Sequence, residues 1–272
     1  MREKSLIRLI GIDVDGTLVG SAGRVHPDIW RAAERARSSG IRLALCSGRP
    51  AFGLALEYSR RLDHEGWHIF QNGASVLDLE RQQSRSVTLP AADVSGFIAE
   101  ARRSARLLEL YSDNAYVSES TSQWARDHAD LLGVPFEFHT FESLRDPVVR
   151  AQWLLPHAEA QQWAATPRPH LEIALSSSPL MPETTFVGIT RAGVNKGSAL
   201  RAIAQEYGFD LADIMYVGDS DNDLPALETV GHPVAMANAT QSVLRIARLT
   251  VGHVDQGGLA EALERAAASA QS

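Results

Sequence analysis

Short apolar runs alternate with helical segments at both ends of this 272-residue chain. Near the N-terminus three such runs are typical of strands buried on both faces of a parallel sheet: Leu6–Ile12, Ile41–Cys46 and Trp67–Phe70. One helix is expected from Pro27 to Ser39, where Gly40 ends it, and another begins at Pro50. This β-α-β-α-β order predicts a doubly wound α/β sheet.

The last third of the chain repeats this order. Its expected helices are Lys196–Tyr207, Asp221–Leu227 and Gly258–Ala268, and its expected strands are Ile214–Val217, Pro233–Ala235 and Ala247–Val251. The sequence therefore predicts a single α/β core built from residues 1–83 and 185–272.

The middle of the chain has a different pattern, with paired strands between helices. The helices expected there are Ala91–Ala105, Thr121–Leu132 and His157–Ala164, and the strands are Leu107–Tyr111, Ala115–Ser118, Val148–Leu155, Leu171–Leu175 and Thr185–Ile189. Such pairs are typical of an antiparallel sheet in an α+β module. We therefore expect residues 84–184 to form a second domain inserted into the core.

Composition excludes several classes of protein. The chain has 26 Lys and Arg against 33 Asp and Glu, and this net charge of −7 argues against a nucleic-acid partner. A single cysteine, Cys46, cannot form an internal disulfide. No apolar run approaches the roughly 18 residues of a membrane span, and the N-terminus does not read as a signal peptide. We expect a cytoplasmic protein without a membrane partner, either a monomer or a homodimer.

The strongest chemical signal is the segment Ile12-Asp13-Val14-Asp15-Gly16, directly after the first expected strand. In extended geometry, Asp13 and Asp15 would point the same way, at the strand end where open α/β sheets bind ligands. Two close carboxylates need a compensating cation or a shared proton, and carboxylate oxygens suit Mg²⁺. An exposed acidic turn at Asp-Gly is the alternative.

Two further positions could hold a phosphoryl group. Ser47 and Gly48 follow the second buried strand, and their hydroxyl and backbone N–H groups could bind phosphoryl oxygens. The alternative is an ordinary turn before the next helix. Lys196 is the first residue of an expected helix, where its positive charge opposes the helix dipole. An anion bound beside Lys196 would explain a cation at this position. A lysine exposed to solvent on the surface is the alternative.

A second acidic segment, Gly218-Asp219-Ser220-Asp221-Asn222-Asp223, follows the buried strand at Ile214–Val217. Three carboxylates and an amide within five residues suit a metal site. Capping the next helix would require only one of them.

Taken in order, these segments resemble the haloacid dehalogenase superfamily, and in particular its Cof-type phosphatases. Asp13 to Leu18 match the motif Asp-x-Asp-Gly-Thr-Leu in full, and Gly218 to Asp223 match Gly-Asp-x-x-Asn-Asp. Asn72-Gly73-Ala74 and Ala235–Ala239 also resemble stretches of Cof-like members. The resemblance covers the whole chain and implies a Rossmann-like core with an inserted α+β cap domain.

The place of the insertion resembles one cap class. Only 31 residues separate Asp15 from Ser47, too few for a cap, whereas 148 residues separate Ser47 from Lys196. This spacing and the helix-strand-strand pattern of the middle segment are similar to a C2 cap of type B.

The resemblance also implies roles for the site residues. Asp13 is the expected nucleophile and Asp15 the general acid and base. Mg²⁺ is expected on Asp13, the backbone carbonyl of Asp15 and Asp219, with Asp223 a direct ligand or one step removed. Four residues are expected to hold the phosphoryl oxygens: Ser47, Gly48, Lys196 and Asn222. Asp15 points to phosphoryl transfer, because the dehalogenases lack an aspartate there.

The implied function is Mg²⁺-dependent hydrolysis of small phosphate monoesters through an aspartyl-phosphate. Sugar phosphates are the favoured substrates, with flavin and pyridoxal phosphates as other options. A phosphomannomutase-like phosphotransferase, or a specialised sucrose-phosphate or mannosyl-3-phosphoglycerate phosphatase, is the second interpretation. A phosphate-binding regulator without catalytic activity is the third.

Overall fold

The computed structural model describes residues 6–178 and 180–270, which divide into two compact units. Of these residues, the first unit comprises 6–48, 55–85 and 195–270, and the second comprises 49–54, 86–178 and 180–194. Residues 185–194 thus belong to the second unit, although the sequence pattern placed them in the core. The reason is strand β10 (Met181–Arg191), which pairs along its length with two other strands of the second unit's sheet.

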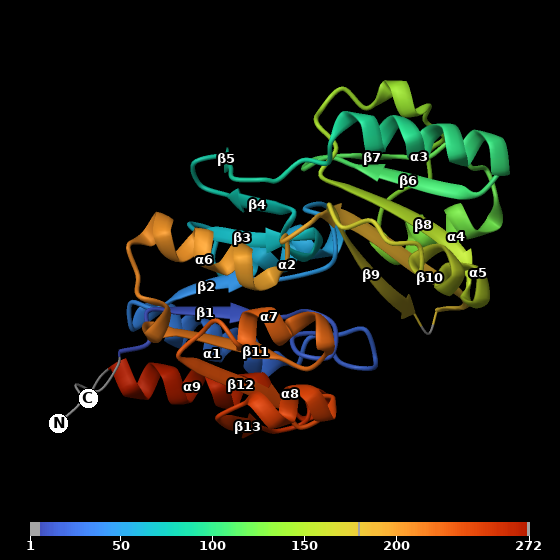
Figure 1. Ribbon diagram of the computed structural model, residues 1–272. Helices are drawn as coiled ribbons and strands as arrows, with labels where there is room; N and C mark the ends of the chain where they lie inside the picture. Colours follow the sequence, from blue (N-terminus) through green and yellow to red (C-terminus); the bar gives the residue numbers. More distant parts are fainter. Residues whose placement is uncertain (1–5, 179, 271–272) are drawn as a thin grey trace. The chain divides into compact units, whose positions relative to one another are not determined.

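The first unit contains a parallel five-stranded sheet with the order β13-β12-β11-β1-β2 (Figure 1). Its strands are β1 (Leu9–Ile12), β2 (Arg42–Leu45), β11 (Ile214–Gly218), β12 (His232–Met236) and β13 (Leu249–Val251). A parallel bridge between Cys46 and Ile69 brings β3 beside β2. The remaining strands form an antiparallel set that the sequence predicted only in part: β3 (Trp67–Phe70), β4 (Ser75–Asp78) and β5 (Gln83–Ser84).

Most helices of the first unit lie where the apolar periodicity predicts them. They are α1 (Pro27–Ser38), α2 (Gly53–Leu62), α6 (Lys196–Tyr207), α7 (Leu224–Leu227), α8 (Gln241–Ile246) and α9 (Gly258–Ala270), with 3-10 turns at Gln71–Gly73, Leu211–Asp213, Asp221–Asp223 and Val254–Gln256. The prediction that α2 begins at Pro50 was wrong. Gly53 has a φ of +58°, a left-handed conformation that a helix running on from Pro50 could not contain.

Helices α6, α7 and α8 pack against one apolar cluster of the sheet, which includes Leu9, Trp67 and Tyr216. Helices α1 and α9 pack on each other and contact β2, β12 and β13 (Figure 1). The strands are consequently covered along their length, and this explains why they are almost continuously apolar.

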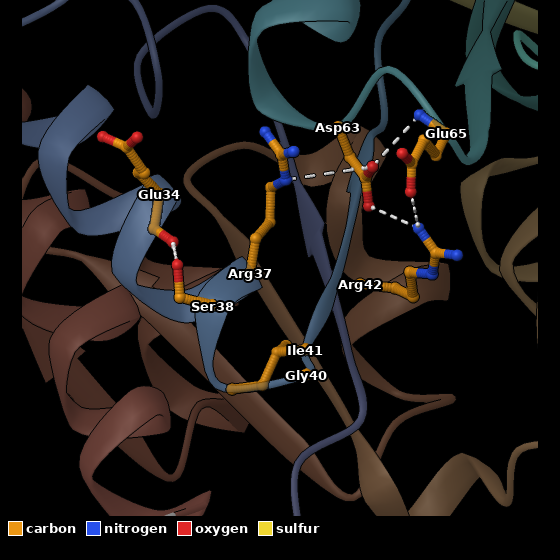
Figure 2. Close-up of a pocket in the computed structure, with 8 residues that line it drawn as sticks. All are labelled: Glu34, Arg37, Ser38, Gly40, Ile41, Arg42, Asp63 and Glu65. Atoms are coloured by element: carbon orange, nitrogen blue, oxygen red, sulfur yellow. Dashed lines mark hydrogen bonds and ion pairs between the residues drawn. The ribbon is translucent and has the colours of Figure 1, made fainter.

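A polar hollow of about 550 Å³ lies in the first unit, beside the start of β2 (Figure 2). Its wall includes the buried carboxylate of Asp63, whose Oδ2 accepts a hydrogen bond from the Leu43 N–H at 3.3 Å and lies 3.5 Å from Arg42. Behind it, His68 accepts a hydrogen bond from the Leu45 N–H through Nδ1 at 3.0 Å, and its Nε2 lies 2.7 Å from the Asp63 carbonyl oxygen. Asp63 and His68 therefore connect β2 to the end of α2 through hydrogen bonds. Burial lowers the pKa of His68 to about 4.

The second unit contains an antiparallel sheet with the order β7-β6-β8-β10-β9. Its other strands are β6 (Leu107–Tyr111), β7 (Tyr116–Val117), β8 (Arg150–Pro156) and β9 (Leu171–Ser178), and its helices are α3 (Ala91–Ser104), α4 (Gln123–Leu132) and α5 (His157–Ala164), with a 3-10 turn at Phe141–Ser143. Helices α3 and α5 pack on a cluster centred on Trp153, while α4 packs on Leu107, Leu154 and Phe186. Leu107 and Leu108 alternate between these clusters, so the helices cover opposite faces of the sheet.

Within the described ranges, every helix is either too short or too polar to cross a membrane.

Candidate active site

Asp13 lies just beyond the carboxyl end of β1, where its N–H donates to the Val217 carbonyl oxygen at 3.0 Å. The strand ends at Ile12 and the chain then turns, with the N–H groups of Leu18 and Val19 both donating to the Val14 carbonyl oxygen. Asp13 and Asp15 both lie beyond the strand end, so strand alternation does not apply to them, and the expectation that they point the same way stays a prediction. The turn buries Asp13 and leaves Asp15 exposed.

The turn places Gly16 against a second acidic segment. Gly16 has a φ of +89°, and a Cβ built on it would lie 2.2 Å from Oδ2 of Asp219. Only glycine allows both this backbone conformation and this close approach. The β1 turn and the end of β11 are therefore in direct contact.

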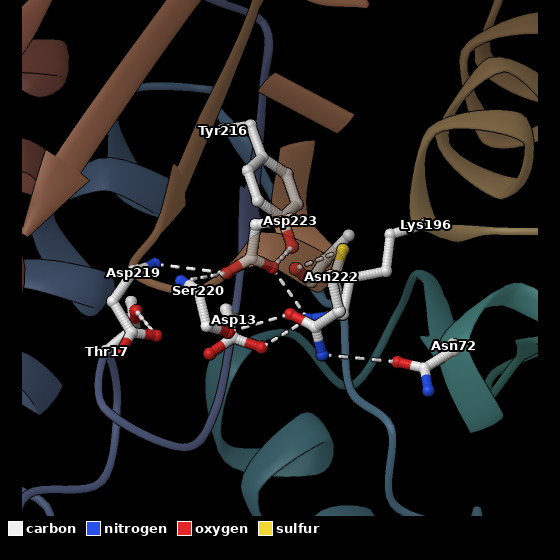
Figure 3. A network of polar contacts seen from close by, with 11 residues as sticks. Asp13, Thr17, Asn72, Lys196, Tyr216, Asp219, Ser220, Asn222 and Asp223 are labelled. Atoms are coloured by element: carbon white, nitrogen blue, oxygen red, sulfur yellow. Dashed lines mark hydrogen bonds and ion pairs between the residues drawn. The ribbon is translucent and has the colours of Figure 1, made fainter. Parts of the chain in front are cut away.

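Asp223 has four hydrogen bonds, and they leave its carboxylate well satisfied. Oδ1 accepts from Lys196 Nζ and from the Tyr216 hydroxyl, both at 2.6 Å. Oδ2 accepts from the N–H groups of Asp219 and Ser220, at 3.0 and 3.1 Å. These contacts hold the loop after β11 in place (Figure 3).

Lys196, the first residue of α6, is fully buried. Its Nζ lies 2.5 Å from Oδ1 of Asp13 and 3.4 Å from Oδ1 of Asn222, in addition to its bond to Asp223 (Figure 3). The two carboxylates explain the unfavourable position of this cation at a helix N-terminus, and they exclude the surface-lysine alternative. Burial opposes its charge, but Asp13 and Asp223 outweigh burial and raise the pKa of Lys196.

Carboxylate oxygens of Asp13, Asp219 and Asp223 lie within 4.8 Å of one another. Burial, reinforced by Asp223, raises the pKa of Asp13 well above its usual range and that of Asp219 to about 6. Three acidic groups thus lie around the single ammonium of Lys196, and a bound cation would favour their ionised forms. The donors are hard oxygen atoms, which fit Mg²⁺. The carboxylate of Asp15 is not part of this cluster.

Ser47 and Gly48 follow β2, and both connect with the segment after β3. The Ser47 carbonyl oxygen accepts a hydrogen bond from the Asn72 N–H at 2.9 Å, and a Cβ on Gly48 would lie 3.1 Å from the Asn72 side chain. Asn222 Nδ2 in turn donates to Asn72 Oδ1 at 3.5 Å. A chain of contacts therefore runs from Gly48 through Asn72 and Asn222 to Lys196.

The structure adds residues that sequence reasoning did not assign to the site. Asn238 donates to the Gly16 carbonyl oxygen at 2.8 Å and lies 3.5 Å from Asp219, and Thr17 lies 3.4 Å from Asp219. Asn72 and Asn238 stand in stretches that had resembled Cof-like members, which was the available signal. The sequence did not indicate a role for Tyr216 in the site, because an aromatic residue in a buried strand is expected to belong to the hydrophobic core.

The sequence of the chain matches a known protein family. The sequence profile of the haloacid dehalogenase-like hydrolases matches residues 10–263. An HMP-PP phosphatase from Serratia proteamaculans is 26% identical over 266 residues, covering 95% of each chain. The 5-amino-6-(5-phospho-D-ribitylamino)uracil phosphatase YwtE from Bacillus subtilis is 26% identical over 286 residues, covering 93% of this chain and 96% of its own.

Solved structures share the fold. A sugar phosphatase of haloacid dehalogenase subclass IIB superimposes with a TM-score of 0.78 at 22% identity, covering 95% of this chain and 98% of its own. The expectation of a doubly wound α/β core with an α+β insertion is therefore confirmed. With Asp13, Asn222 and Asp223 gathered around Lys196, the chain belongs to the haloacid dehalogenase-like hydrolases, as an enzyme of the Cof-type phosphatase group.

Proposed function

We propose that this enzyme hydrolyses small phosphate monoesters in the presence of Mg²⁺, through an aspartyl-phosphate formed on Asp13. The main support is the buried cluster in which Asp13 and Asp223 both contact Lys196 while Asp219 lies beside them. Such an arrangement keeps a nucleophilic carboxylate close to a cation and to candidate metal ligands. The substrate is a small phosphorylated metabolite, in keeping with a cytoplasmic location.

In the first half-reaction, a carboxylate oxygen of Asp13 attacks phosphorus in line and forms a P–O bond. The bond between phosphorus and the leaving oxygen breaks, and Asp15 donates its proton to that oxygen, which leaves as an alcohol. Asp15 is exposed, so it can exchange protons with solvent between turnovers.

In the second half-reaction, the Asp15 carboxylate removes a proton from a water molecule, whose oxygen attacks phosphorus. The bond from phosphorus to Asp13 breaks, and inorganic phosphate and the Asp13 carboxylate are regenerated. Lys196, Ser47, Gly48 and Asn222 hold the phosphoryl oxygens in both steps. Lys196 would offset charge on these oxygens as well as on Asp13.

Asp13, the backbone carbonyl of Asp15, and Asp219 would hold the metal ion. When bound, Mg²⁺ offsets the negative charge of the phosphoryl group and stabilises the charge that develops in the transition state. Asp223 already accepts four hydrogen bonds, so we assign it to positioning Lys196 and the Asp219 loop rather than to direct ligation.

We further propose that the first unit is the catalytic core and that the second unit is a type C2B cap. The antiparallel sheet of the second unit and its insertion between Ser47 and Lys196 support this assignment.

The first experiment measures phosphate release from a panel of sugar, nucleotide, flavin and pyridoxal phosphates, with Mg²⁺ and with EDTA. Release that requires Mg²⁺ is the expected result. Isomerised sugar phosphate from a hexose 1-phosphate would instead indicate a mutase. Absence of turnover for the whole panel would overturn the proposal and favour the phosphate-binding regulator.

A matched pair of variants tests the metal ligands. Asp219→Asn is expected to raise the Mg²⁺ concentration for half-maximal activity at least tenfold. Asp221→Asn removes a nearby exposed carboxylate that accepts from Thr240, and it should leave this concentration within about twofold. Equal effects of the two variants would remove Asp219 from the metal site.

A further inference from the structure

The segment of residues 14–25, between β1 and α1, contains Asp15, and Val19 organises the backbone around it. The Val19 N–H donates to the Val14 carbonyl oxygen at 2.8 Å, and the Val19 carbonyl oxygen accepts from the Gly16 N–H at 3.0 Å. Val19 is buried and forms a parallel bridge with Asp15. Both chain neighbours of Asp15 are therefore hydrogen-bonded to Val19, so the position of Asp15 depends on where Val19 lies.

One carboxylate from near the end of the chain contacts the two residues directly after Val19. Asp255 Oδ1 accepts a hydrogen bond from the Ser21 N–H at 2.8 Å, and Asp255 Oδ2 accepts one from the Ser21 hydroxyl at 2.9 Å. A Cβ built on Gly20 would lie 2.3 Å from Asp255 Oδ1, so a side chain at this position would displace the carboxylate. Asp255 thus fixes the backbone at Gly20 and Ser21, although 234 positions separate it from Ser21.

Asp255 belongs to the 3-10 turn Val254–Gln256, and this turn is connected to the same segment at a second place. The Val254 N–H donates to Asn238 Oδ1 at 3.0 Å, and Asn238 Nδ2 donates to the Gly16 carbonyl oxygen at 2.8 Å. The turn therefore supports the segment on both sides of Val19, at Gly16 through Asn238 and at Ser21 through Asp255.

We propose that Asp255 is a positioning residue for the phosphatase reaction, which holds the segment of residues 14–25 so that Asp15 can donate its proton to the leaving oxygen. This inference rests on the proposed function, in which Asp15 is the general acid. A general acid has to lie within hydrogen-bond reach of the group that it protonates, so a displaced segment slows the step that needs this proton. The hydrogen bonds from the Ser21 N–H and hydroxyl hold the pKa of Asp255 below its usual range, so the carboxylate stays charged at neutral pH.

Hydrogen–deuterium exchange of the full chain tests the contact without catalysis. Asp255→Ala should speed exchange of the backbone N–H groups of residues 16–23 at least tenfold, because the segment opens more often once its support is lost. Asp255→Asn keeps an oxygen that accepts from the Ser21 N–H and gains an amide that donates to the Ser21 hydroxyl, so its exchange should stay within about twofold. Unchanged exchange in Asp255→Ala would overturn the inference.

Asp210→Ala is the matched control. Asp210 is an exposed carboxylate of the first unit that accepts a hydrogen bond from the Ala212 N–H at 2.8 Å, in the 3-10 turn before β11. Its loss should leave exchange in residues 16–23 unchanged.

The dependence of the rate on the leaving group separates positioning of Asp15 from a general effect on the fold. The leaving group of 2,4-dinitrophenyl phosphate departs without a proton, whereas the leaving oxygen of glucose 6-phosphate needs one. With Mg²⁺, Asp255→Ala should lower kcat/KM for glucose 6-phosphate at least tenfold and for 2,4-dinitrophenyl phosphate less than about threefold. Asp255→Asn should stay within about threefold of the unmodified enzyme with both esters. Equal losses of kcat/KM for the two esters in Asp255→Ala would overturn the inference, because a disturbed fold or metal site slows both reactions.

Ser21→Ala keeps the test decisive if Asp255→Ala loses stability. It removes only an exposed hydroxyl, so the variant should fold normally, and kcat/KM for glucose 6-phosphate should fall roughly threefold. Adding Ser21→Ala to Asp255→Ala should cause no further loss, because the bond between the two side chains is already absent. A further loss as large as that of Ser21→Ala alone would show that the two residues act independently and would overturn the inference.

The two measurements distinguish failure of this inference from failure of the proposed function. Phosphate release by the unmodified enzyme, together with unchanged exchange and unchanged kcat/KM in Asp255→Ala, would overturn the inference alone. Faster exchange in Asp255→Ala, with no phosphate release by the unmodified protein from any ester tested, would support the contact between Asp255 and the segment but overturn the phosphatase function and the role of Asp15 in it.

Discussion

The ammonium group of Lys196 lies 2.5 Å from Oδ1 of Asp13, although 183 positions separate the two residues in the chain. Lys196 begins α6 and Asp13 follows β1, and both side chains are buried. A buried ammonium ion is costly unless it is paired, so Lys196 and its carboxylates depend on one another. This relationship leads to predictions for both stability and catalysis.

Lys196→Met should lower the free energy of unfolding by about 3–5 kcal/mol at pH 7, because it leaves Asp13 and Asp223 buried without their cation. Urea unfolding measures the loss. Adding Asp13→Asn to Lys196→Met should restore part of it, since one of the stranded charges is removed. Arg201→Met, on the exposed side of the same helix, should cost less than about 1 kcal/mol. Equal losses for Lys196→Met and Arg201→Met would show that the buried pair contributes no special stability.

Asp13→Asn should reduce kcat by at least about 10³-fold, because an amide oxygen is a poor nucleophile toward phosphorus. The variant keeps the shape of the side chain, and Lys196 retains Asp223 as a partner. Phosphate release gives the rate, and circular dichroism with thermal melting checks the fold. A folded Asp13→Asn protein with normal turnover would contradict the aspartyl-phosphate mechanism. Mass spectrometry of acid-quenched unmodified enzyme should detect the phosphorylated chain.

Gly16→Ala should impair Mg²⁺-dependent activity, whereas Gly23→Ala should not. Both glycines have positive φ, +89° and +68°, so each alanine incurs backbone strain of about 1–2 kcal/mol. Only at Gly16 would the new Cβ also meet Asp219, at 2.2 Å, while nothing lies within 4 Å of it at Gly23. Titration of activity with Mg²⁺ should give at least a tenfold higher half-maximal concentration for Gly16→Ala. Similar curves for the two variants would mean that the contact between Gly16 and Asp219 has no influence on the metal site.

Protonation of His68 should destabilise the fold as the pH falls. Its pKa is about 4 in the folded chain against an ordinary value of 6.5, because burial disfavours the charged ring. Between these two pH values the unfolded chain binds the proton more readily, so the stability that neutral His68 confers is complete above pH 6.5 and is lost toward pH 4. The loss should reach about 3 kcal/mol.

Unfolding free energies at pH 7, 6, 5 and 4.5 check this prediction. His68→Gln cannot titrate at this position, so its stability should fall less steeply over the same range, whatever its stability at pH 7. Parallel pH profiles for the unmodified protein and His68→Gln would rule out His68 as the titrating group.

Local patterns in the sequence predicted most elements of the fold. Trp67–Phe70, Leu107–Tyr111, His157–Ala164 and Lys196–Tyr207 have the predicted bounds. These segments carry their own signals, such as the capping box at Asn195 and the left-handed Gly208 that ends α6. The strands β4 and β5 escaped prediction, because β4 is set by antiparallel pairing with β3 and β5 by pairing with β4, and not by a periodic pattern of their own.

The length of β10 was also decided by tertiary structure. The expected strand Thr185–Ile189 extends in both directions to Met181 and Arg191, because β8 and β9 supply hydrogen-bond partners on its two sides. This extension carries residues 185–194 into the second unit. A sequence shows which residues can form a strand, but the neighbours determine where it ends.

The sequence by itself determined which groups could form the site: Asp13, Asp15, Lys196 and Asp219 stand in ordered motifs next to buried strands. Only the tertiary structure decided their relationships. It buried Asp13 and exposed Asp15 through a turn, it paired Lys196 with two carboxylates, and it satisfied Asp223 with Tyr216 and two backbone N–H groups. The physical reason is that charge pairing and burial depend on distances between segments far apart in the chain, whereas motifs and periodicity are properties of neighbouring residues.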